Sequence, residues 1–310
     1  MEIEVVNKQE YEKRVEQCKY IYNNVWFHEL NKNKVDKIYY LLFKTSKYKF
    51  GITAGVMKEV MLFPYSAPFS IFEKLYKDIN IENIEELLIE LEKFGKQTGV
   101  NRIQFCIPPN FYDESYISML QNCLLRSGYD IKQCDLNYQF RIISKEYLEK
   151  TLKRNAKKNL KIAEKLPYRL FHCDNLEMKK KAYNIIQINR SSKGYPLRMS
   201  WEQVKNTIKE IEHDFFILKL NDEEIAAAVV FGVTSEIFQV IYWGDIPEKS
   251  SNKPMNYLAY HLYLYYLEKN VKILDIGIST ENGFPNYGLC SFKESIGCEV
   301  STKYTYVKEL

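Results

Sequence analysis

The sequence predicts an α/β (α+β) protein of two domains, each a mixed, mostly antiparallel sheet flanked by helices. The chain has 310 residues, which is more than one compact domain usually holds. The same order of elements also occurs twice, as a three-stranded meander followed by helix, strand, helix and strand. Because a strand that follows a crossover helix returns parallel, each sheet is expected to be mixed. We place the domains at residues 1–145 and 146–310.

In the first half, three strand-like segments joined by tight polar or glycine-containing turns predict the meander, and helical spacing predicts the long helix. Gly99 and Gly128 are expected to end the two helices, because glycine readily adopts the left-handed conformation at a helix end. The predicted elements are strands 36–44, 48–55 and 59–63, a helix around 84–94, strand 102–107, helix 114–127 and strand 131–142, which completes the unit.

The second half opens with helices and then follows the same course. Pro254 marks the first turn of its long helix, where the missing N–H costs nothing. Gly297 is expected to end the last helix. The predicted elements are strands 215–220, 224–233 and 237–243, helix 254–268, strand 271–278, helix 289–296 and a closing strand 299–307.

A basic helix lies between the two halves. Leu152, Ala156, Leu160 and Ala163 occupy one face at helical spacing, and lysines occupy another. Two interpretations remain open for this basic face. It is either the solvated side of an amphipathic helix or a wall that faces phosphates of a nucleotide, a coenzyme or a tRNA end.

Composition narrows the class of protein. The net charge is only +4, which does not indicate a dedicated nucleic-acid binder but permits an anionic substrate. The seven cysteines include no C-x-x-C pair and are expected to be reduced and mostly buried, and the four histidines lack the spacing of metal ligands. No apolar run reaches eighteen residues, and the amino terminus lacks an apolar core. We therefore expect a cytoplasmic protein with no metal and no membrane span.

The last forty residues carry the most specific motif. A strand ending in Asp275-Ile276-Gly277 leads through a loop to a short helix that contains Phe292 and Lys293. In full, the motif residues are Asp275, Gly277, Gly288, Leu289, Phe292, Lys293 and Gly297. Two further stretches, the basic helix at 153–163 and Tyr242-Trp243-Gly244-Asp245 with the later 253–258, extend the pattern. Together they resemble the FemAB-like branch of the GNAT acyltransferases over about residues 150–310.

This resemblance implies two tandem GNAT-like domains and an N-acyltransferase. The donor would be an acyl thioester (acyl-CoA) or an aminoacyl-tRNA, used as co-substrate, with no permanently bound cofactor. The acceptor would be the amine of a small molecule, such as an amino sugar or a cell-envelope precursor, and the acceptor end of a tRNA is a possible partner. The alternative is a non-catalytic tandem-GNAT module that binds a ligand or partner.

The resemblance also implies where the site lies. In a GNAT sheet the fourth and fifth strands splay apart, here 237–243 and 271–278. Lys293 is the predicted catalytic residue, and its alternative is a structural ion pair with Asp275 or Glu294. Substrate or donor binding is predicted for residues at the strand ends and in the adjacent motifs: Tyr242, Trp243, Asp245, Lys253, Asn256, Asp275, Ser279, Asn286 and Phe292. Of these, Phe292 is expected to pack more than to touch substrate.

Three loops hold further candidate binding residues. The segment 248–256 lacks the glycines with which coenzyme A-dependent relatives cradle pyrophosphate, so Lys249 and Lys253 either hold a phosphate or are solvated. In the first half, Tyr65 and Ser66 follow the third strand in a proline-flanked loop, which either helps bind the acceptor or is a rigid connection. Arg190 and Tyr195 are weaker candidates, for which a plain surface loop is the preferred interpretation.

Overall fold

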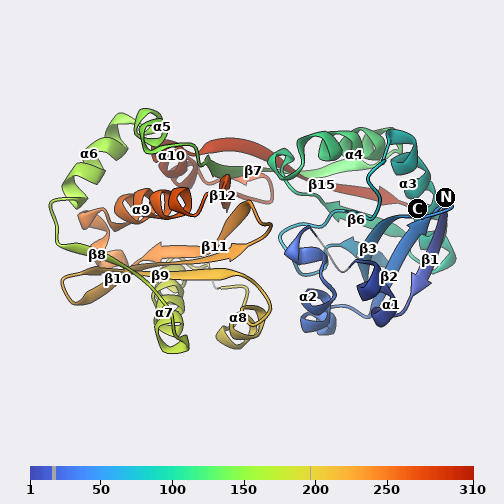
Figure 1. The fold of residues 1–310 in the computed structure, drawn as a ribbon, viewed down its shortest axis with the longest axis horizontal. Helices are drawn as coiled ribbons and strands as arrows, with labels where there is room; N and C mark the ends of the chain where they lie inside the picture. The colour runs from blue at the N-terminus through green and yellow to red at the C-terminus, as the bar shows by residue number, and fades with distance from the viewer. Residues whose placement is uncertain (16–18, 196) are drawn as a thin grey trace. The chain divides into compact units, whose positions relative to one another are not determined.

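The computed structural model describes residues 1–15, 19–195 and 197–310 (Figure 1). Contacts divide the chain into two compact units. Unit 1 comprises Met1–Leu136, Glu281–Phe284 and Ser301–Leu310, and unit 2 comprises Asn137–Thr280 and Pro285–Val300. The chain therefore changes unit between Leu136 and Asn137, and a domain boundary near residue 145 stays a prediction.

Unit 1 is a mixed sheet in the order β1-β2-β3-β4-β6-β15. All neighbouring strands are antiparallel except β4 and β6, which are parallel. The strands are β1 (Glu2–Val6), β2 (Lys37–Lys44), β3 (Tyr48–Met57), β4 (Val60–Phe63), β5 (Glu73–Lys74, paired with β3), β6 (Arg102–Cys106), β7 (Asp130–Arg141) and β15 (Glu299–Glu309). The helices are α1 (Lys8–Arg14), α2 (Val25–Leu30), α3 (Ile81–Gln97) and α4 (Glu114–Arg126), with 3₁₀ turns at Ile21–Asn23, Lys32–Lys34 and Asn110–Tyr112.

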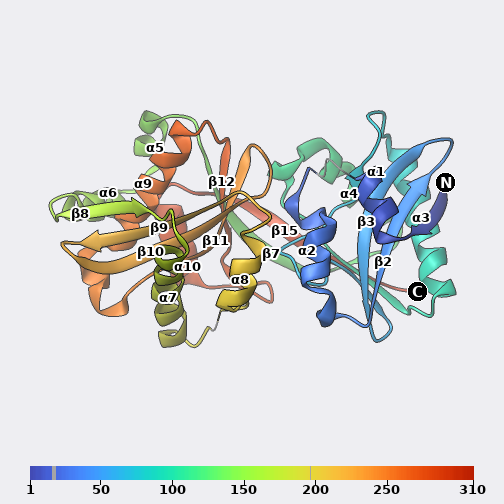
Figure 2. The ribbon, with the colours of Figure 1, turned by 60° about the horizontal axis from the view of Figure 1, so that its bottom comes forward.

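The long helix α3 forms where the apolar spacing predicts it. Asn80 caps its first turn by accepting from the Asn83 N–H at 3.0 Å. Leu87, Leu88 and Leu91 are fully buried, so one face of the helix packs into unit 1. Both chain ends lie next to α3: the amino terminus pairs with Glu86, and a Cβ at Gly95 would meet Leu310 (Figures 1 and 2).

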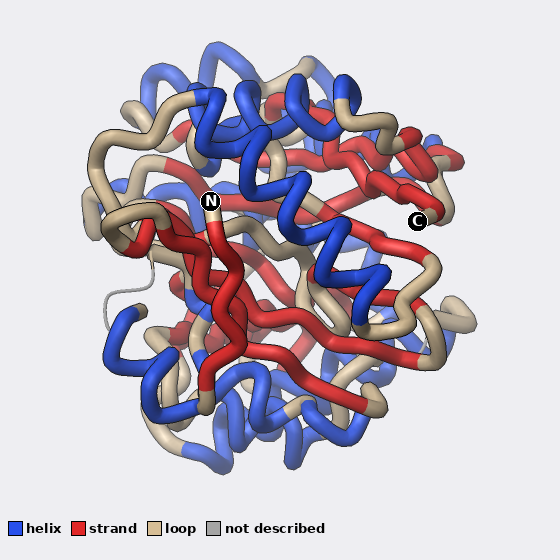
Figure 3. Tube along the Cα trace, turned by 90° about the vertical axis from the view of Figure 1, so that its right-hand side faces the viewer, coloured by secondary structure: helices blue, strands red, loops and turns tan. Residues whose placement is uncertain are grey.

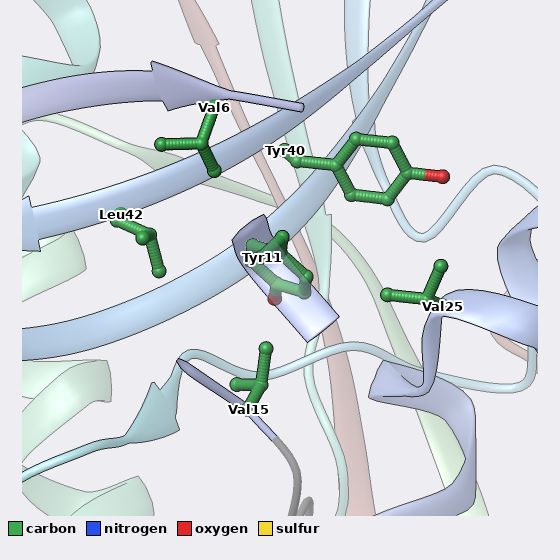
Figure 4. Close-up of a cluster of buried hydrophobic side chains, with 6 residues drawn as sticks. All are labelled: Val6, Tyr11, Val15, Val25, Tyr40 and Leu42. Carbon is green, nitrogen blue, oxygen red and sulfur yellow. The ribbon is translucent and has the colours of Figure 1, made fainter. Parts of the chain in front are cut away.

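The N-terminal segment adds an edge strand that the sequence pattern did not predict. β1 runs antiparallel along β2 (Figure 3). On this side of the sheet a cluster of buried side chains forms between β1, β2, α1 and α2 (Figure 4). Its members are Val6, Tyr11, Val15, Val25, Tyr40 and Leu42. This packing anchors the first residues of the chain to the meander.

Unit 2 is a mixed sheet in the order β7-β12-β11-β10-β9-β8, with β11 and β12 as its parallel pair. Its further strands are β8 (Tyr168–His172), β9 (His213–Leu220), β10 (Glu223–Gly232), β11 (Ile237–Asp245) and β12 (Ile273–Ile278). Its helices are α5 (Lys145–Thr151), α6 (Arg154–Ala163), α7 (Leu176–Ser192), α8 (Trp201–Thr207), α9 (Pro254–Glu268) and α10 (Tyr287–Ser295), with a 3₁₀ turn at Pro247–Asn252. The short strands β13 (Thr280–Glu281) and β14 (Phe284–Pro285) form a separate two-stranded sheet.

Helices α7 and α9 cover opposite faces of this sheet (Figures 1 and 2). Both pack on β10 and β11. The strands between them are therefore buried on both sides, which explains the nearly continuous apolar run in β10. The predicted helix 254–268 has the observed bounds of α9.

The expectation that each half closes with its own last strand is wrong. The second part of β7, residues 137–141, pairs with β12 in unit 2. The last part of β15, residues 305–309, pairs with β6 in unit 1. The two strands have 12 and 11 residues, so one end of each strand can belong to unit 1 and the other end to unit 2. Sequence proximity therefore predicted the strands but not their partners.

Candidate active site

A fork between two parallel strands is the most distinctive feature of unit 2. β11 and β12 pair only over residues 237–239 and 273–275. Beyond that point β11 continues to Asp245 and β12 to Ile278, and within these described strands the two no longer pair. This confirms the predicted splay. Along the outer part of β11, the backbone groups that face β12 therefore form no ladder hydrogen bonds with it.

Each arm of the fork carries a β-bulge. In β11 the register against β10 shifts at Ile241, which is the extra residue. In β12 the register against β7 shifts between Asp275 and Gly277, so Ile276 is the extra residue. A bulge bends its strand and re-aims the residues that follow. The two bulges therefore account for the divergence of the strands.

The side chain of Asp275 braces the base of the fork. Its Oδ2 accepts from Gln239 Nε2 on β11 at 2.7 Å. Its Oδ1 accepts from Asn137 Nδ2 on β7 at 2.7 Å and from the Gly277 N–H at 2.8 Å. The residue is only 1% exposed. These bonds tie three strands together, and a contact of Asp275 with substrate stays a prediction.

Lys293 is buried beneath the end of β12. Its Nζ donates to the carbonyl oxygens of Ile276 (3.0 Å), Gly277 (2.8 Å) and Ile278 (3.0 Å). Gly277 has a φ of +74°, a left-handed conformation that suits glycine and helps successive carbonyls converge on one ammonium. The ammonium also lies 5.5 Å from the ring centroid of Tyr138. These contacts use all three N–H donors of the lysine.

The electrostatic surroundings of Lys293 depress its basicity. Burial lowers the pKa of Lys293 to about 8, against the opposing effects of Cys298 and Asp275, and the positive charge of Arg190 adds to the lowering. Glu294, one predicted ion-pair partner, instead binds Lys153 at 2.8 Å. A catalytic role for Lys293 stays a prediction, because the contacts describe how the ammonium is held and not what it does.

Aromatic residues connect β11 to α10. Trp243 on β11 and Phe292 on α10 meet edge to face, with ring centroids 6.2 Å apart. Trp243 is buried and Phe292 is half-buried, which agrees with the expectation that Phe292 packs. The Tyr242 hydroxyl accepts from the Met199 N–H at 3.2 Å.

The end of β11 is fastened to helix α7. Asn189 Nδ2 donates to the backbone oxygen of Asp245 at 2.6 Å and to its Oδ1 at 3.1 Å, and Ser250 Oγ donates to Oδ2 at 2.7 Å. A Cβ on Gly244 would lie 2.7 Å from the Asn189 side chain, so only glycine permits this approach. Asp245 therefore acts here as an anchor between strand, helix and loop.

Two buried polar atoms at the fork have no hydrogen-bond partner among the described residues. One is Nε of Arg190, in the last turn of α7, and the other is Oγ of Ser279, just after β12. Ser279 is 2% exposed. An unsatisfied buried donor is costly, so each orphan indicates a group that a ligand could satisfy. Arg190 lies in α7 and not in the loop that its sequence context predicted, and its role in binding stays a prediction.

The first turn of α9 offers few free amides to a phosphate. Pro254 has no N–H, and the Asn256 N–H bonds to the Lys253 carbonyl at 3.2 Å. Lys253 adopts a left-handed φ of +59°, and its ammonium has no ion pair within the described part of the chain. Lys249 pairs with Glu223 at 2.6 Å. Few backbone amides are therefore open at this helix start to replace the glycine cradle that the sequence lacks.

Asn286 has a local structural contact. Its Oδ1 caps α10 by accepting from the Leu289 N–H at 3.0 Å. Its own N–H donates to the Ser279 carbonyl at 2.9 Å. The cap therefore ties the helix that carries Lys293 to the end of β12, and direct substrate binding by Asn286 stays a prediction.

Tyr65 and Ser66 belong to unit 1 and have partners within it. The Tyr65 hydroxyl donates to the His28 carbonyl at 2.8 Å, and its ring covers Gly55. Ser66 Oγ donates to Asn31 Oδ1 at 2.9 Å and accepts from Lys34 Nζ at 2.6 Å. These bonds hold the loop in the manner of a rigid connection, and acceptor binding by these residues stays a prediction.

The parallel pair of unit 1 is not forked. β4 pairs with β6 along all four of its residues. The loop after β4 then returns to β6, where the Ser70 N–H donates to the Cys106 carbonyl at 2.9 Å and Cys106 Sγ donates to the Pro68 carbonyl at 3.4 Å. Unit 2 alone, within the described residues, therefore presents a splayed parallel pair.

The basic helix α6 forms as predicted, with Ala156, Leu160 and Ala163 buried. Its cations, Arg154, Lys157, Lys158 and Lys161, are exposed. Over the described ranges these four make no ion pair. Both interpretations of the basic face, solvated surface or phosphate contact, remain open.

A second charged cluster surrounds Asp214 on β9. Its carboxylate accepts from Tyr266 at 2.9 Å and contacts His172 Nε2 at 2.7 Å and Lys269 at 3.2 Å. Burial alone would raise the pKa of Asp214, but the bonds from His172 and Tyr266 and the charge of Lys269 lower it below its usual value. The cluster ties β8 and β9 to α9 and lies outside the fork.

Cysteines 106, 123, 134, 173, 290 and 298 are free. Cys123, Cys173 and Cys290 are buried, and Cys134 is exposed. Cys18 lies outside the described residues. In the described ranges no group of three or more His, Cys, Asp and Glu side chains is arranged to hold a metal ion. None of the helices in these ranges combines the length and apolarity needed to cross a bilayer.

Comparison with solved structures finds the same fold over the whole chain. The structure of FemX has 13% identity and a TM-score of 0.71, and the match covers 100% of this chain and 98% of that one. L-PGS from Bacillus licheniformis has 14% identity and a TM-score of 0.61 over 98% of this chain and 92% of that one. A conserved protein from Bacteroides thetaiotaomicron has 10% identity and a TM-score of 0.59, with 99% of each chain covered.

No protein-family model matches the sequence, and no curated protein matches it either. The structural matches show that this chain has the fold of the FemX structure over its whole length, which agrees with the predicted fold class. At these identities they do not extend to activity.

Proposed function

We propose that this chain is an N-acyltransferase whose reaction takes place at the fork of unit 2. The observation that carries the proposal is the divergence of β11 and β12, with a bulge on each arm and a buried carboxylate at its base. The fork frees the backbone of β11 to bind an acyl carbonyl. The unforked pair of unit 1 offers no equivalent edge.

In the proposed reaction the acceptor nitrogen attacks the carbonyl carbon of the donor. A C–N bond forms, and the C–S bond of a thioester or the C–O bond of an aminoacyl ester breaks. The amine loses one proton, and the leaving sulfur or ribose oxygen takes one up. The developing oxyanion needs N–H groups or positive charge held in place beforehand. The open edge of β11 would supply N–H groups. Lys293, held at the end of β12, and Arg190, which interacts with Tyr242 of β11, would add positive charge.

Lys293 would serve this reaction first as a positioning residue. Its three bonds to β12 carbonyls fix the arm of the fork, and its charge adds to the local positive potential. The same full set of bonds is the observation that favours the alternative, a non-catalytic module that retains the fold. A lysine with all donors engaged has no free N–H for a substrate.

The donor is proposed to be an acyl-CoA or an aminoacyl-tRNA, and the acceptor the amine of an amino sugar or a cell-envelope precursor. Few backbone N–H groups are free at the start of α9, so pyrophosphate binding of the kind seen in the usual glycine cradle is disfavoured there. A structure of the same fold has lysylphosphatidylglycerol synthetase in its name, and this name makes an aminoacyl donor worth testing beside the thioester.

The experiment is a transfer assay with labelled acyl-CoA species and labelled aminoacyl-tRNA against a panel of amines, read by mass spectrometry. The proposal expects an amide product that depends on the protein. Trp243→Leu, at the fork, should lower product formation, whereas Trp26→Leu in unit 1 removes an indole elsewhere and should not. Binding of a donor without amide formation from any amine would favour the non-catalytic module.

A further inference from the structure

We propose that Arg190 binds a phosphate group of the substrate at the open end of the fork. Arg190 is half-buried, and its Nε is closed to solvent without a hydrogen-bond partner. The two Nη atoms form no hydrogen bond to the described residues, and they are accessible to solvent. The Nε side of the guanidinium is therefore buried in unit 2, whereas its Nη atoms are accessible to a ligand.

The chain does not neutralise this guanidinium. Arg190 makes no ion pair with any residue that the structure describes. The two buried carboxylates of the fork have other partners: Asp245 accepts from Asn189 and Ser250, and Asp275 accepts from Gln239 and Asn137. An uncompensated, partly buried charge is costly to keep. An anion from outside the chain would offset that cost.

Other positive charges surround the same position. Burial lowers the pKa of Arg190; the Tyr242 hydroxyl opposes this effect, and the neighbouring charge of Arg198 adds to the lowering. The positive charge of Arg190 in turn helps to lower the pKa of Lys293, which lies under β12. The potential at this end of the fork is therefore positive, and it suits a phosphate better than a neutral group. A guanidinium offers paired N–H groups that match two phosphate oxygens.

The position of Arg190 is fixed by its neighbour in sequence. Asn189 bonds to Asp245 at the end of β11, in the space that Gly244 leaves. Lys193 donates to Asn189 Oδ1 at 3.3 Å and completes this contact. The last turn of α7, which carries Arg190, is thereby held against β11, so little further ordering is needed when a ligand binds. Preorganisation of this kind lowers the entropic cost of binding.

The source of the phosphate rests on the proposed function. Both proposed donors carry phosphates, acyl-CoA in its pyrophosphate and aminoacyl-tRNA in its phosphodiester chain. Arg190 would hold that group so that the acyl carbon lies at the open edge of β11. It would be a binding residue for the donor, separate from any residue that moves a proton.

The test measures binding of inorganic pyrophosphate to the full chain by calorimetry, with no transfer reaction. Arg190→Gln should weaken binding roughly tenfold or more, because hydrogen bonds to charged groups are worth more than neutral ones. Arg190→Lys keeps the charge but not the paired N–H groups and should restore only part of the affinity. Arg169→Gln is the matched control: Arg169 is an exposed cation on β8 in the same unit, and its loss should change binding less than twofold.

Coenzyme A and an RNA hairpin ending in CCA then compete with pyrophosphate, and the one that displaces it identifies the source. Pyrophosphate binding that is equal in wild type and Arg190→Gln, or that falls equally in Arg169→Gln, would overturn the inference. So would the failure of both competitors. Arg190-dependent binding together with no amide formation would instead support this site and count against the proposed transfer.

Discussion

Replacing Lys293 with methionine should destabilise the protein by about 3 kcal/mol. The substitution removes three hydrogen bonds from a charged donor to the carbonyls of residues 276–278, each worth about 1.5–3 kcal/mol. Part of this loss is offset, because the variant no longer buries an ammonium, which costs several kcal/mol. Methionine keeps the apolar stem, so little packing is lost. For a domain of this size the midpoint of thermal unfolding should fall by about 6–12 °C.

Circular dichroism melts and urea unfolding of the same variant measure this effect. Lys158→Met is the control, since Lys158 is exposed on α6 and makes no ion pair among the described residues; its change should stay within about 0.5 kcal/mol. A Lys293→Met variant that melts with the wild type would refute the reasoning. If the variant loses stability but its folded fraction turns over normally, the predicted catalytic role of Lys293 is wrong.

Three further substitutions and conditions follow from the contacts. The stability advantage of wild type over Lys293→Met should grow by up to about 3 kcal/mol from pH 8 to pH 10.5. Burial lowers the folded-state pKa of Lys293 to about 8, so in this range the unfolded chain binds the proton more readily than the folded chain does. A constant difference in the free energy of urea unfolding across these pH values would contradict this. Asp214→Asn should lower the free energy of unfolding by about 3 kcal/mol near neutral pH. Because the folded-state pKa of Asp214 is lowered, this loss relative to wild type should shrink as the pH falls below about 4. Chemical unfolding at pH 7 and pH 3 tests it. Gly244→Ala should cost about 1–3 kcal/mol, because its Cβ would lie 2.7 Å from Asn189; an unchanged melting midpoint would show that α7 shifts freely.

Much of the fold could be predicted from the sequence because local patterns specify it. The apolar spacing in α3 and the first-turn proline of α9 gave these helices within a few residues. The parallel pairs β4–β6 and β11–β12 followed from the helix between the strands. Strand partners were harder, since β7 and β15 each divide between two units and no local pattern encodes that choice.

The site was predicted in outline and not in its contacts. The motif around Lys293 pointed to the end of β12, where the lysine is found, but spacing could not reveal that its partners are backbone carbonyls. Asn189 was missed although a signal exists. It is a lone polar residue that continues the apolar face of α7 set by Ala182, Ile185 and Ile186. A buried amide on such a face indicates a specific partner, here Asp245.

The most direct test of the fork as the acyl-binding site is hydrogen–deuterium exchange of residues 240–245 with and without donor. These residues form the arm of β11 that β12 leaves unpaired. If the acyl carbonyl binds to that edge, the amides of 240–245 should exchange more slowly when the productive donor, acyl-CoA or aminoacyl-tRNA, is added, while those of β4 in unit 1 keep their rate. Donor binding that leaves 240–245 unchanged would contradict the account.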